Sequence, residues 1–195
     1  MIRSSTSSRP RKSLVLGRFQ PLHIGHIEYL EAARKRADCL VIGVTNPDIN
    51  RLIHDTADPS RSRAENNPFT YFDRQQMITA HLLEAGWNCR DFAVVPAPVT
   101  TPAEMSSFLP TPAITIVCVT TYGPWGDRKA DLMASLGYEV EILWRRDDID
   151  RLTSGTQIRQ AMRSGGEWRR FVPPAVARYL DDSGWTAALQ AQSAR

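Results

Sequence analysis

The stretch GRFQPLHIGH, residues 17–26, decides the fold of this chain. It directly follows the apolar run SLVL (13–16) and leads into a helical pattern. A buried strand, a polar turn and a helix in this order open an α/β domain, where the turn lies at the carboxyl end of the strand and ligands bind. An ordinary surface turn needs one or two polar residues. The concentration of Arg18, His23 and His26 in this turn therefore indicates a binding site.

Further short apolar runs alternate with helical patterns along the chain. Four of the five expected strands are nearly continuous apolar runs, which is typical of strands covered on both faces in a parallel sheet. The expected strands are Ser13–Leu16, Cys39–Thr45, Phe92–Pro96, Ile114–Thr120 and Glu139–Trp144. The expected helices are Gly25–Arg36, Thr70–Ala85, Gly126–Leu136, Thr153–Arg163 and Pro174–Leu180. The order βαβαβαβαβ predicts an α/β fold with a doubly wound, parallel five-stranded sheet.

The length of 195 residues, 42% of them hydrophobic, is enough to bury the core of one domain. We expect that domain over residues 13–186, between a flexible tail at 1–12 and a second tail at 187–195. The net charge of +3 is too small to indicate nucleic-acid binding. No apolar run approaches the roughly 18 residues of a membrane helix, and the basic start has no secretory core. We expect a cytoplasmic protein with no membrane or nucleic-acid partner.

The three cysteines, Cys39, Cys89 and Cys118, are far apart in the sequence. Their odd number and the apolar surroundings of two of them favour buried free thiols over a disulfide or a metal site. Such thiols suit a reducing compartment.

A second polar motif, TSGTQIR (153–159), begins a later helix. Ser154 and Thr156 lie where the free backbone N–H groups of a helix favour an anion, and Arg159 follows Thr156 by three residues on the same face. A plain capped helix with a solvated arginine is the alternative. In the first motif, His23 and His26 are placed to donate to phosphate oxygens, and Gly25 would let a nucleotide approach the backbone.

Together the two motifs resemble the nucleotidyltransferases that carry the H-x-G-H signature (the HIGH superfamily), especially the archaeal-type nicotinamide-nucleotide adenylyltransferases. Further stretches that are similar to that group are NPFTYFDRQQMI (67–78), TTYG (120–123), LGYEVEI (136–142) and GGEWRRFVPPAV (165–176). The resemblance implies a Rossmann-like nucleotidyltransferase fold. It also implies a reaction in which an acceptor phosphate attacks the α-phosphate of a nucleoside triphosphate and pyrophosphate leaves.

The resemblance implies roles for individual residues. The catalytic candidates are His23, His26, Arg18 and Arg159. The nucleotide-binding candidates are Gly17, Arg18, Phe19, Gln20, His23, Gly25, His26, Gly123, Trp125, Asp127, Ser154, Thr156 and Arg159. Mg²⁺ would be held mainly by the triphosphate, with no metal ligands from the protein. Relatives that form rings of subunits imply a homo-oligomer.

The sequence also departs from the family in the regions that would bind the acceptor. The helix expected before the fourth strand has no tryptophan to stack on nicotinamide, and Phe108 is the only aromatic residue of TTPAEMSSFLPTP (100–112). The loop 46–67 is longer than in the family and rich in basic residues. Its functional interpretation is a lid that closes on an anionic acceptor, and the alternative is a solvated loop. The acceptor-binding candidates are Arg51, His54, Arg61, Arg63, Asn66 and Arg74.

A missing aromatic platform and added arginines favour an acceptor that is smaller and more anionic than nicotinamide mononucleotide. The favoured function is therefore a cytidylyltransferase that uses CTP and a small phosphonate in specialised metabolism. One alternative is an adenylyltransferase that makes NAD, with Phe108 or Trp87 in place of the tryptophan. Two further alternatives are a fragment of a class I aminoacyl-tRNA synthetase, suggested by the letters HIGH, and a non-catalytic nucleotide sensor. The chain length and the lack of a KMSKS-like loop weigh against the synthetase.

Overall fold

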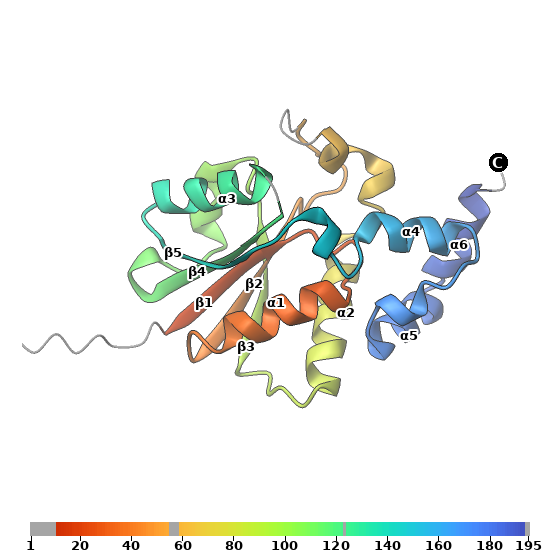
Figure 1. Ribbon diagram of the computed structural model, residues 1–195, viewed down its shortest axis with the longest axis horizontal. Coiled ribbons are helices and arrows are strands. Elements are labelled where there is room, and N and C mark those ends of the chain that lie inside the picture. The colour runs from red at the N-terminus through yellow and green to blue at the C-terminus, as the bar shows by residue number, and fades with distance from the viewer. Residues whose placement is uncertain (1–10, 55–58, 123, 194–195) are drawn as a thin grey trace, which may run out of the picture.

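Five parallel strands form one sheet in the computed structural model, which describes residues 11–54, 59–122 and 124–193. The strands are β1 (Lys12–Gly17), β2 (Cys39–Thr45), β3 (Phe92–Ala97), β4 (Thr115–Thr121) and β5 (Glu139–Arg145). Their order in the sheet is β3-β2-β1-β4-β5, and every neighbouring pair is parallel (Figure 1). This arrangement confirms the predicted doubly wound sheet. The strand order reverses between β1 and β4, and ligands of such sheets bind at that point.

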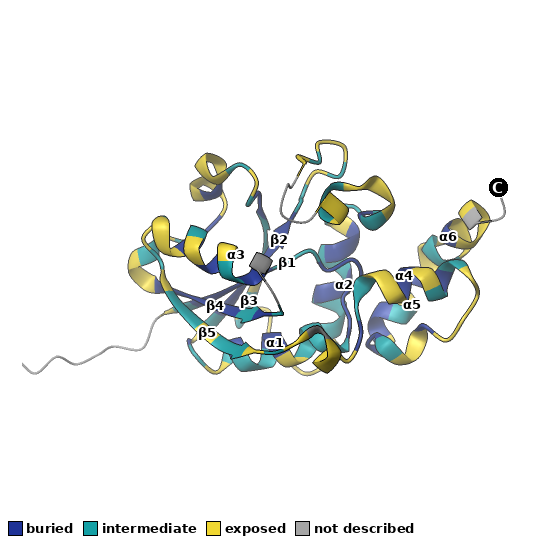
Figure 2. Ribbon diagram, turned by 45° about the horizontal axis from the view of Figure 1, so that its top comes forward, coloured by how far each residue is buried: buried dark blue, intermediate teal, exposed yellow. Residues whose placement is uncertain are grey.

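Two apolar layers cover the sheet because alternate side chains of each strand point to opposite faces. Val15 and Ile42 belong to a cluster that packs against α1 (Ile24–Arg34) and α2 (Tyr71–Glu84). Leu14 and its neighbours on the other face pack against α3 (Pro124–Ser135). Figure 2 shows the inner strands buried between helices whose outer faces are exposed. β1, β2 and β4 are buried along most of their length, which explains their continuous apolar sequences, whereas the edge strands β3 and β5 are partly exposed.

The C-terminal helices α4 (Gly155–Arg163), α5 (Pro174–Asp182) and α6 (Trp185–Ser193) lie together at one end of the molecule (Figure 1). They continue the α1–α2 core, since the Trp185 ring meets Phe69 edge-on with ring centroids 5.2 Å apart. Leu189 of α6 is fully buried. Residues 187–193, expected to be a tail, are therefore helical and packed, while residues 1–10 of the expected N-terminal tail lie outside the described residues.

The connection between β3 and β4 differs from the prediction. The alternating order calls for an α-helix, but the chain forms short 3-10 turns at Pro102–Ser107 and Pro112–Ile114. Proline lacks a backbone N–H and clashes with the preceding helical turn, so the prolines of this stretch exclude a continuous α-helix. Phe108 follows the first turn and is 43% exposed.

The cysteines are all free, as predicted, but only Cys118 is buried. Cys39 is half-buried and Cys89 is exposed, so the expectation of buried thiols is wrong for Cys89. Cys89 belongs to the turn between α2 and β3, where no apolar layer covers it.

Among the described helices, none is long and apolar enough to cross a lipid bilayer. The expected homo-oligomer stays a prediction.

Candidate active site

A cavity of about 560 Å³ opens at the carboxyl ends of β1 and β4, where the strand order reverses. Both motifs meet in it. From the first motif the lining residues are Gly17, Arg18, Phe19, Gln20, His23, Gly25 and His26. From the second they are Thr153, Ser154, Gly155, Thr156 and Arg159. The tertiary structure thus joins two segments that are about 130 residues apart in the sequence.

The turn from β1 into α1 is shaped around the buried ring of Phe19. Phe19 has a left-handed backbone with φ of +52°, which is uncommon for a residue with a side chain and occurs mostly at functional sites. A Cβ on Gly17 would lie 2.8 Å from that ring, so only glycine fits there. His23 then occupies the N-cap of α1, and its carbonyl accepts from the backbone N–H groups of His26 (2.8 Å) and Ile27 (3.2 Å). This geometry places His23 and His26 on one face of the helix.

The two histidine rings stack with their centroids 3.7 Å apart. Nδ1 of each ring is buried and has no hydrogen-bond partner among the described residues. Burial, followed by the charges of Arg151 and Arg159, lowers the pKa of His23 to about 3. Burial, followed by His23, Arg18 and Lys129, lowers the pKa of His26 well below its usual value. Both rings are therefore neutral at pH 7 in the free protein.

The second motif begins α4 with a capping box. Ser154 Oγ accepts from the backbone N–H of Gln157 at 3.2 Å, and Gln157 Oε1 accepts from the backbone N–H of Ser154 at 2.9 Å. A Cβ on Gly155 would lie 2.5 Å from the carbonyl oxygen of Gln20. The glycine therefore allows the first turn of α4 to approach the β1–α1 turn closely.

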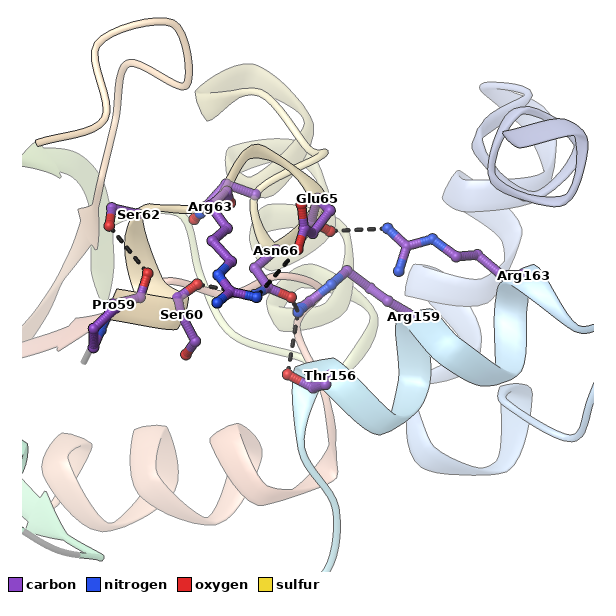
Figure 3. Close-up of polar contacts among 10 residues, drawn as sticks. Pro59, Ser60, Ser62, Arg63, Glu65, Asn66, Thr156, Arg159 and Arg163 are labelled. Carbon is purple, nitrogen blue, oxygen red and sulfur yellow. Dashed lines mark hydrogen bonds and ion pairs between the residues drawn. The ribbon is translucent and has the colours of Figure 1, made fainter. Parts of the chain in front are cut away.

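Arg159 is 1% exposed, so the alternative of a solvated arginine is wrong. Its Nη1 donates to the Gln20 carbonyl at 2.6 Å, and its Nη2 donates to Thr156 Oγ1 at 3.2 Å and Asn66 Oδ1 at 2.7 Å (Figure 3). Its Nε is buried with no partner among the described residues. Burial, followed by Arg18 and Arg163, lowers the pKa of Arg159 to about 10, which leaves it charged at pH 7.

The basic loop contributes less to the cavity than expected. Of its predicted acceptor-binding residues, Arg61 lines the cavity. Asn66 lies beside it and binds Arg159. Arg51 and His54 are exposed outside the lining, and Arg63 is exposed and paired with Glu65 at 3.7 Å.

Arg74 requires a correction, because it is fully buried and absent from the cavity lining. Its guanidinium donates to backbone carbonyls alone among its described partners. These carbonyls belong to Arg18 (3.1 Å), Thr45 (2.7 Å), Asn46 (2.8 Å), Pro47 (3.3 Å) and Thr70 (3.0 Å). Arg74 therefore fixes the chain where it leaves β1 and β2, and it is committed to the protein rather than to an acceptor.

Gln20 has a similar structural role. Its side-chain Nε2 donates to the Phe69 carbonyl at 2.8 Å, and its Oε1 accepts from the Phe69 backbone N–H at 3.0 Å. The amide expected to bind nucleotide therefore joins the first motif to the segment before α2. The carbonyl of Gln20 meets Arg159 instead.

The exit of β4, expected to bind the base, is described in part. Gly123 and the side chain of Trp125 lie outside the described residues. Asp127 pairs with Arg145 and does not line the cavity. The lining here comes from Tyr122 and Gly126, with the guanidinium of Arg151 lying 4.6 Å from the centroid of the Tyr122 ring.

Several polar lining residues outside the two motifs were not expected from the sequence. Among them are Ser60, Thr120, Tyr122, Arg128, Lys129 and Arg151. Lys129 is the one that the sequence could have revealed. It precedes the buried Met133 by four residues and so lies on the apolar face of α3, where a lysine is unusual.

The cavity is strongly cationic. Its described lining holds six basic side chains and one carboxylate, Glu28, which is paired with Arg146 at 2.7 Å. The six are Arg18, Arg61, Arg128, Lys129, Arg151 and Arg159. Among the described residues, no group of three or more His, Cys, Asp or Glu side chains could hold a metal ion. The six basic side chains make the lining rich in N–H donors of the kind that bind anions.

Comparison with known proteins agrees with this geometry. A family model described as cytidylyltransferase-like matches residues 14–91. The chain is 39% identical to a phosphonoformate cytidylyltransferase of Streptomyces viridochromogenes, over 91% of this chain and 95% of that protein. The chain belongs to the cytidylyltransferase-like nucleotidyltransferases. This membership replaces the alternative of an aminoacyl-tRNA synthetase fragment.

Other relatives of this cytidylyltransferase-like protein are nicotinamide-nucleotide adenylyltransferases. It is 31% identical to that of Methanothrix thermoacetophila, over 88% of this chain and 90% of the relative. It is 29% identical to that of Thermococcus onnurineus, over 89% of this chain and 83% of the relative. The relatives are thus cytidylyl- and adenylyltransferases, as the motifs predicted.

The fold is shared with a solved structure from Francisella tularensis. That protein is a bifunctional NMN adenylyltransferase/ADP-ribose pyrophosphatase in complex with AMP and a manganese ion. The TM-score is 0.62 at 16% identity. The match covers 95% of this chain but only 52% of the other, so the chain spans about half the length of that protein.

Proposed function

We propose that this protein is a cytidylyltransferase that transfers CMP from CTP to a small phosphonate and releases pyrophosphate. The observation that carries the proposal is the cationic cavity around the stacked pair His23 and His26, whose buried Nδ1 atoms have no described partner. Six basic side chains around a neutral pair favour an anion-rich ligand such as a triphosphate. The choice of CTP and a phosphonate is carried over from the relative that is 39% identical.

In the proposed reaction, an oxygen of the phosphonate attacks the α-phosphorus of CTP. A new P–O bond forms, the bond from the α-phosphorus to the bridging oxygen breaks, and pyrophosphate leaves with the released negative charge. His26 and Arg18 would stabilise the charge around the α-phosphate. His23, Arg159 and the first turn of α4 would bind the leaving pyrophosphate. Catalysis would then consist of positioning and charge stabilisation, without a covalent enzyme intermediate.

Mg²⁺ would enter as part of the nucleotide substrate. Phosphate oxygens and water are its preferred ligands, and the basic lining offers N–H donors to the same phosphates. The residues of this chain would therefore bind the magnesium–nucleotide complex through its phosphates.

The structure favours the phosphonate over nicotinamide mononucleotide as the acceptor. Neither aromatic residue considered as a replacement for the family tryptophan lines the cavity. Phe108 is 43% exposed outside the cavity. Trp87 is buried in the core, where its ring packs edge-on against Phe92 with centroids 6.3 Å apart and lies 4.0 Å from the Arg34 guanidinium. Neither Phe108 nor Trp87 therefore offers nicotinamide a stacking partner in the cavity.

The test is pyrophosphate release with Mg²⁺ from ATP, CTP, GTP and UTP, each paired with phosphonoformate, other small phosphonates and nicotinamide mononucleotide. We expect the highest kcat/KM with CTP and a phosphonate, with the CMP adduct identified by mass spectrometry. A higher kcat/KM for ATP with nicotinamide mononucleotide would overturn the proposal in favour of NAD synthesis. CTP binding without pyrophosphate release for any acceptor would favour the nucleotide sensor.

A further inference from the structure

Lys129 of α3 lines the cavity at the carboxyl end of β1. It is 6% exposed, and its Nζ donates to the Leu16 carbonyl at 3.1 Å, at the end of β1. The same Nζ lies 5.8 Å from the centroid of the Tyr29 ring in α1. The ammonium group therefore sits between the layers, at the point where the strand order reverses.

Arg61 of the basic loop lines the same cavity as Lys129. The Arg61 carbonyl accepts from Asn46 Nδ2 at 3.0 Å and from Asn67 Nδ2 at 2.8 Å, so its backbone is held against the end of β2. Its charge lies close enough that, after burial, it is a cause of the lowered pKa of Lys129, about 7. Two basic side chains that line the same cavity offer N–H donors to an anionic ligand, and a bound anion would favour the charged form of Lys129.

Hydrogen bonds place Arg159 and Lys129 at two ends of the cavity. Arg159 of α4 donates to the Gln20 carbonyl, within the β1–α1 turn. Lys129 of α3 donates to the Leu16 carbonyl, at the end of β1. If the α4 end holds the pyrophosphate part of CTP, the Lys129 end lies beyond the α-phosphate, where the acceptor must approach.

We propose that Lys129 and Arg61 bind a second acidic group of the acceptor, a carboxylate beside the attacking phosphonate, and so select for carboxylated phosphonates. The proposal rests on the proposed function, which places CTP at the α4 end. A lysine suits a single carboxylate because its ammonium is a compact point charge. Arginine supplies 21 of the 24 basic residues of the chain, so the lysine here contrasts with the rest of the cavity.

The test compares two acceptors that share the attacking group. Phosphonoformate carries the carboxylate, and methylphosphonate lacks it. In Lys129→Met, we expect kcat/KM for phosphonoformate to fall about 10- to 100-fold, mainly through KM, as for the loss of a charged hydrogen bond. The value for methylphosphonate and the KM for CTP should stay within about threefold. Lys35→Met, at the exposed C-terminal end of α1 and outside the cavity lining, is the matched control.

An equal loss with both acceptors would overturn the proposal, because Lys129 would then act on the transferred phosphate. No loss with either acceptor would also overturn it. Arg61→Met is a second variant on the loop surface, and it should show the same selective loss if Lys129→Met does not fold.

The outcome also separates this inference from the proposed function. If the wild-type protein releases no pyrophosphate from CTP with either acceptor, the proposed function fails. Titration calorimetry of phosphonoformate and methylphosphonate into wild type and Lys129→Met then decides the inference. A preference for phosphonoformate that Lys129→Met abolishes supports it, and equal binding by both proteins rejects it.

Discussion

The guanidinium of Arg159 donates to Oδ1 of Asn66 at 2.7 Å, which joins α4 to the basic loop (Figure 3). The same guanidinium donates to the Gln20 carbonyl at 2.6 Å in the β1–α1 turn. One buried side chain thus holds three segments around the cavity. Its Nε is buried and has no partner among the described residues. The amide of Asn66 also holds the chain next to Arg61, because Asn66 Nδ2 donates to the Ser60 carbonyl at 2.9 Å.

Replacing Asn66 should loosen the acceptor end of the cavity. In Asn66→Ala, both hydrogen bonds of the amide are lost, so residues 59–61 are held less firmly. We expect KM for the acceptor to rise about three- to tenfold, a cost of about 1 kcal/mol. The KM for CTP should rise less, because Arg159 keeps its hydrogen bonds to Gln20 and Thr156. Steady-state kinetics measure this, and hydrogen exchange should become faster in residues 59–66. Asn50→Ala, on the exposed part of the same loop, is the control. A larger effect on CTP than on the acceptor would contradict this role.

The proposed role of His26 predicts a loss of turnover with little loss of binding. Removing one donor to the developing charge should lower kcat by roughly 10²–10³ in His26→Ala. The affinity for CTP, measured by calorimetry, should change only a few-fold. His81→Ala on α2, outside the cavity lining, controls for the loss of an imidazole. Near-normal turnover in His26→Ala would remove the assignment.

Arg74 should be essential for stability and not for acceptor recognition. The three nitrogens of the Arg74 side chain bond five carbonyls, and the single ammonium nitrogen of a lysine cannot reach all of them, so Arg74→Lys loses several buried hydrogen bonds. We expect the free energy of unfolding to fall by about 3 kcal/mol or more, measured by denaturant titration. The KM for the acceptor, measured at low temperature on folded protein, should stay within about threefold of wild type. A selectively raised KM at normal stability would restore Arg74 to the acceptor site. Arg90→Lys on the exposed surface is the control.

The stacked histidines predict that the free protein loses stability as the pH falls. The folded-state pKa of His23 is about 3, and that of His26 is also lowered, so below pH 6.5 the unfolded chain binds protons that the folded chain does not. The contribution of the two neutral rings to the free energy of unfolding should therefore be complete above pH 6.5. Between pH 6.5 and 5 it should decrease, with a slope of up to about 1.4 kcal/mol per pH unit for each ring.

Denaturant titrations at pH 7, 6 and 5 measure this slope. Pyrophosphate should reduce it, because a bound anion stabilises the imidazolium form. In the double variant His23→Asn, His26→Asn the slope should be smaller than in wild type. An unchanged slope in that variant would show that other groups carry the pH dependence.

The secondary structure could be predicted where local signals were strong. β2 is an unbroken apolar run over Cys39–Thr45, and the structure gives the same bounds because both faces of that strand are covered. Thr70 caps α2 as expected, since Asp73 completes its capping box. The connection around Phe108 was mispredicted because its prolines outweighed the alternating order. α6 was missed because its stability comes from burying Leu189 against distant helices, which no local pattern shows.

By itself, the sequence determined the chemistry at the two turns. GRFQPLHIGH and TSGTQIR contain the glycines and the polar side chains of the site, so the kind of chemistry could be inferred from these short stretches alone. The tertiary structure decided which charges face the cavity. Of the basic residues in the loop, Arg61 lines the cavity. Arg74 donates to backbone carbonyls instead, and Lys129 of α3 donates to the end of β1. The reason is physical: burial and the charge around a side chain depend on segments that are distant in the sequence.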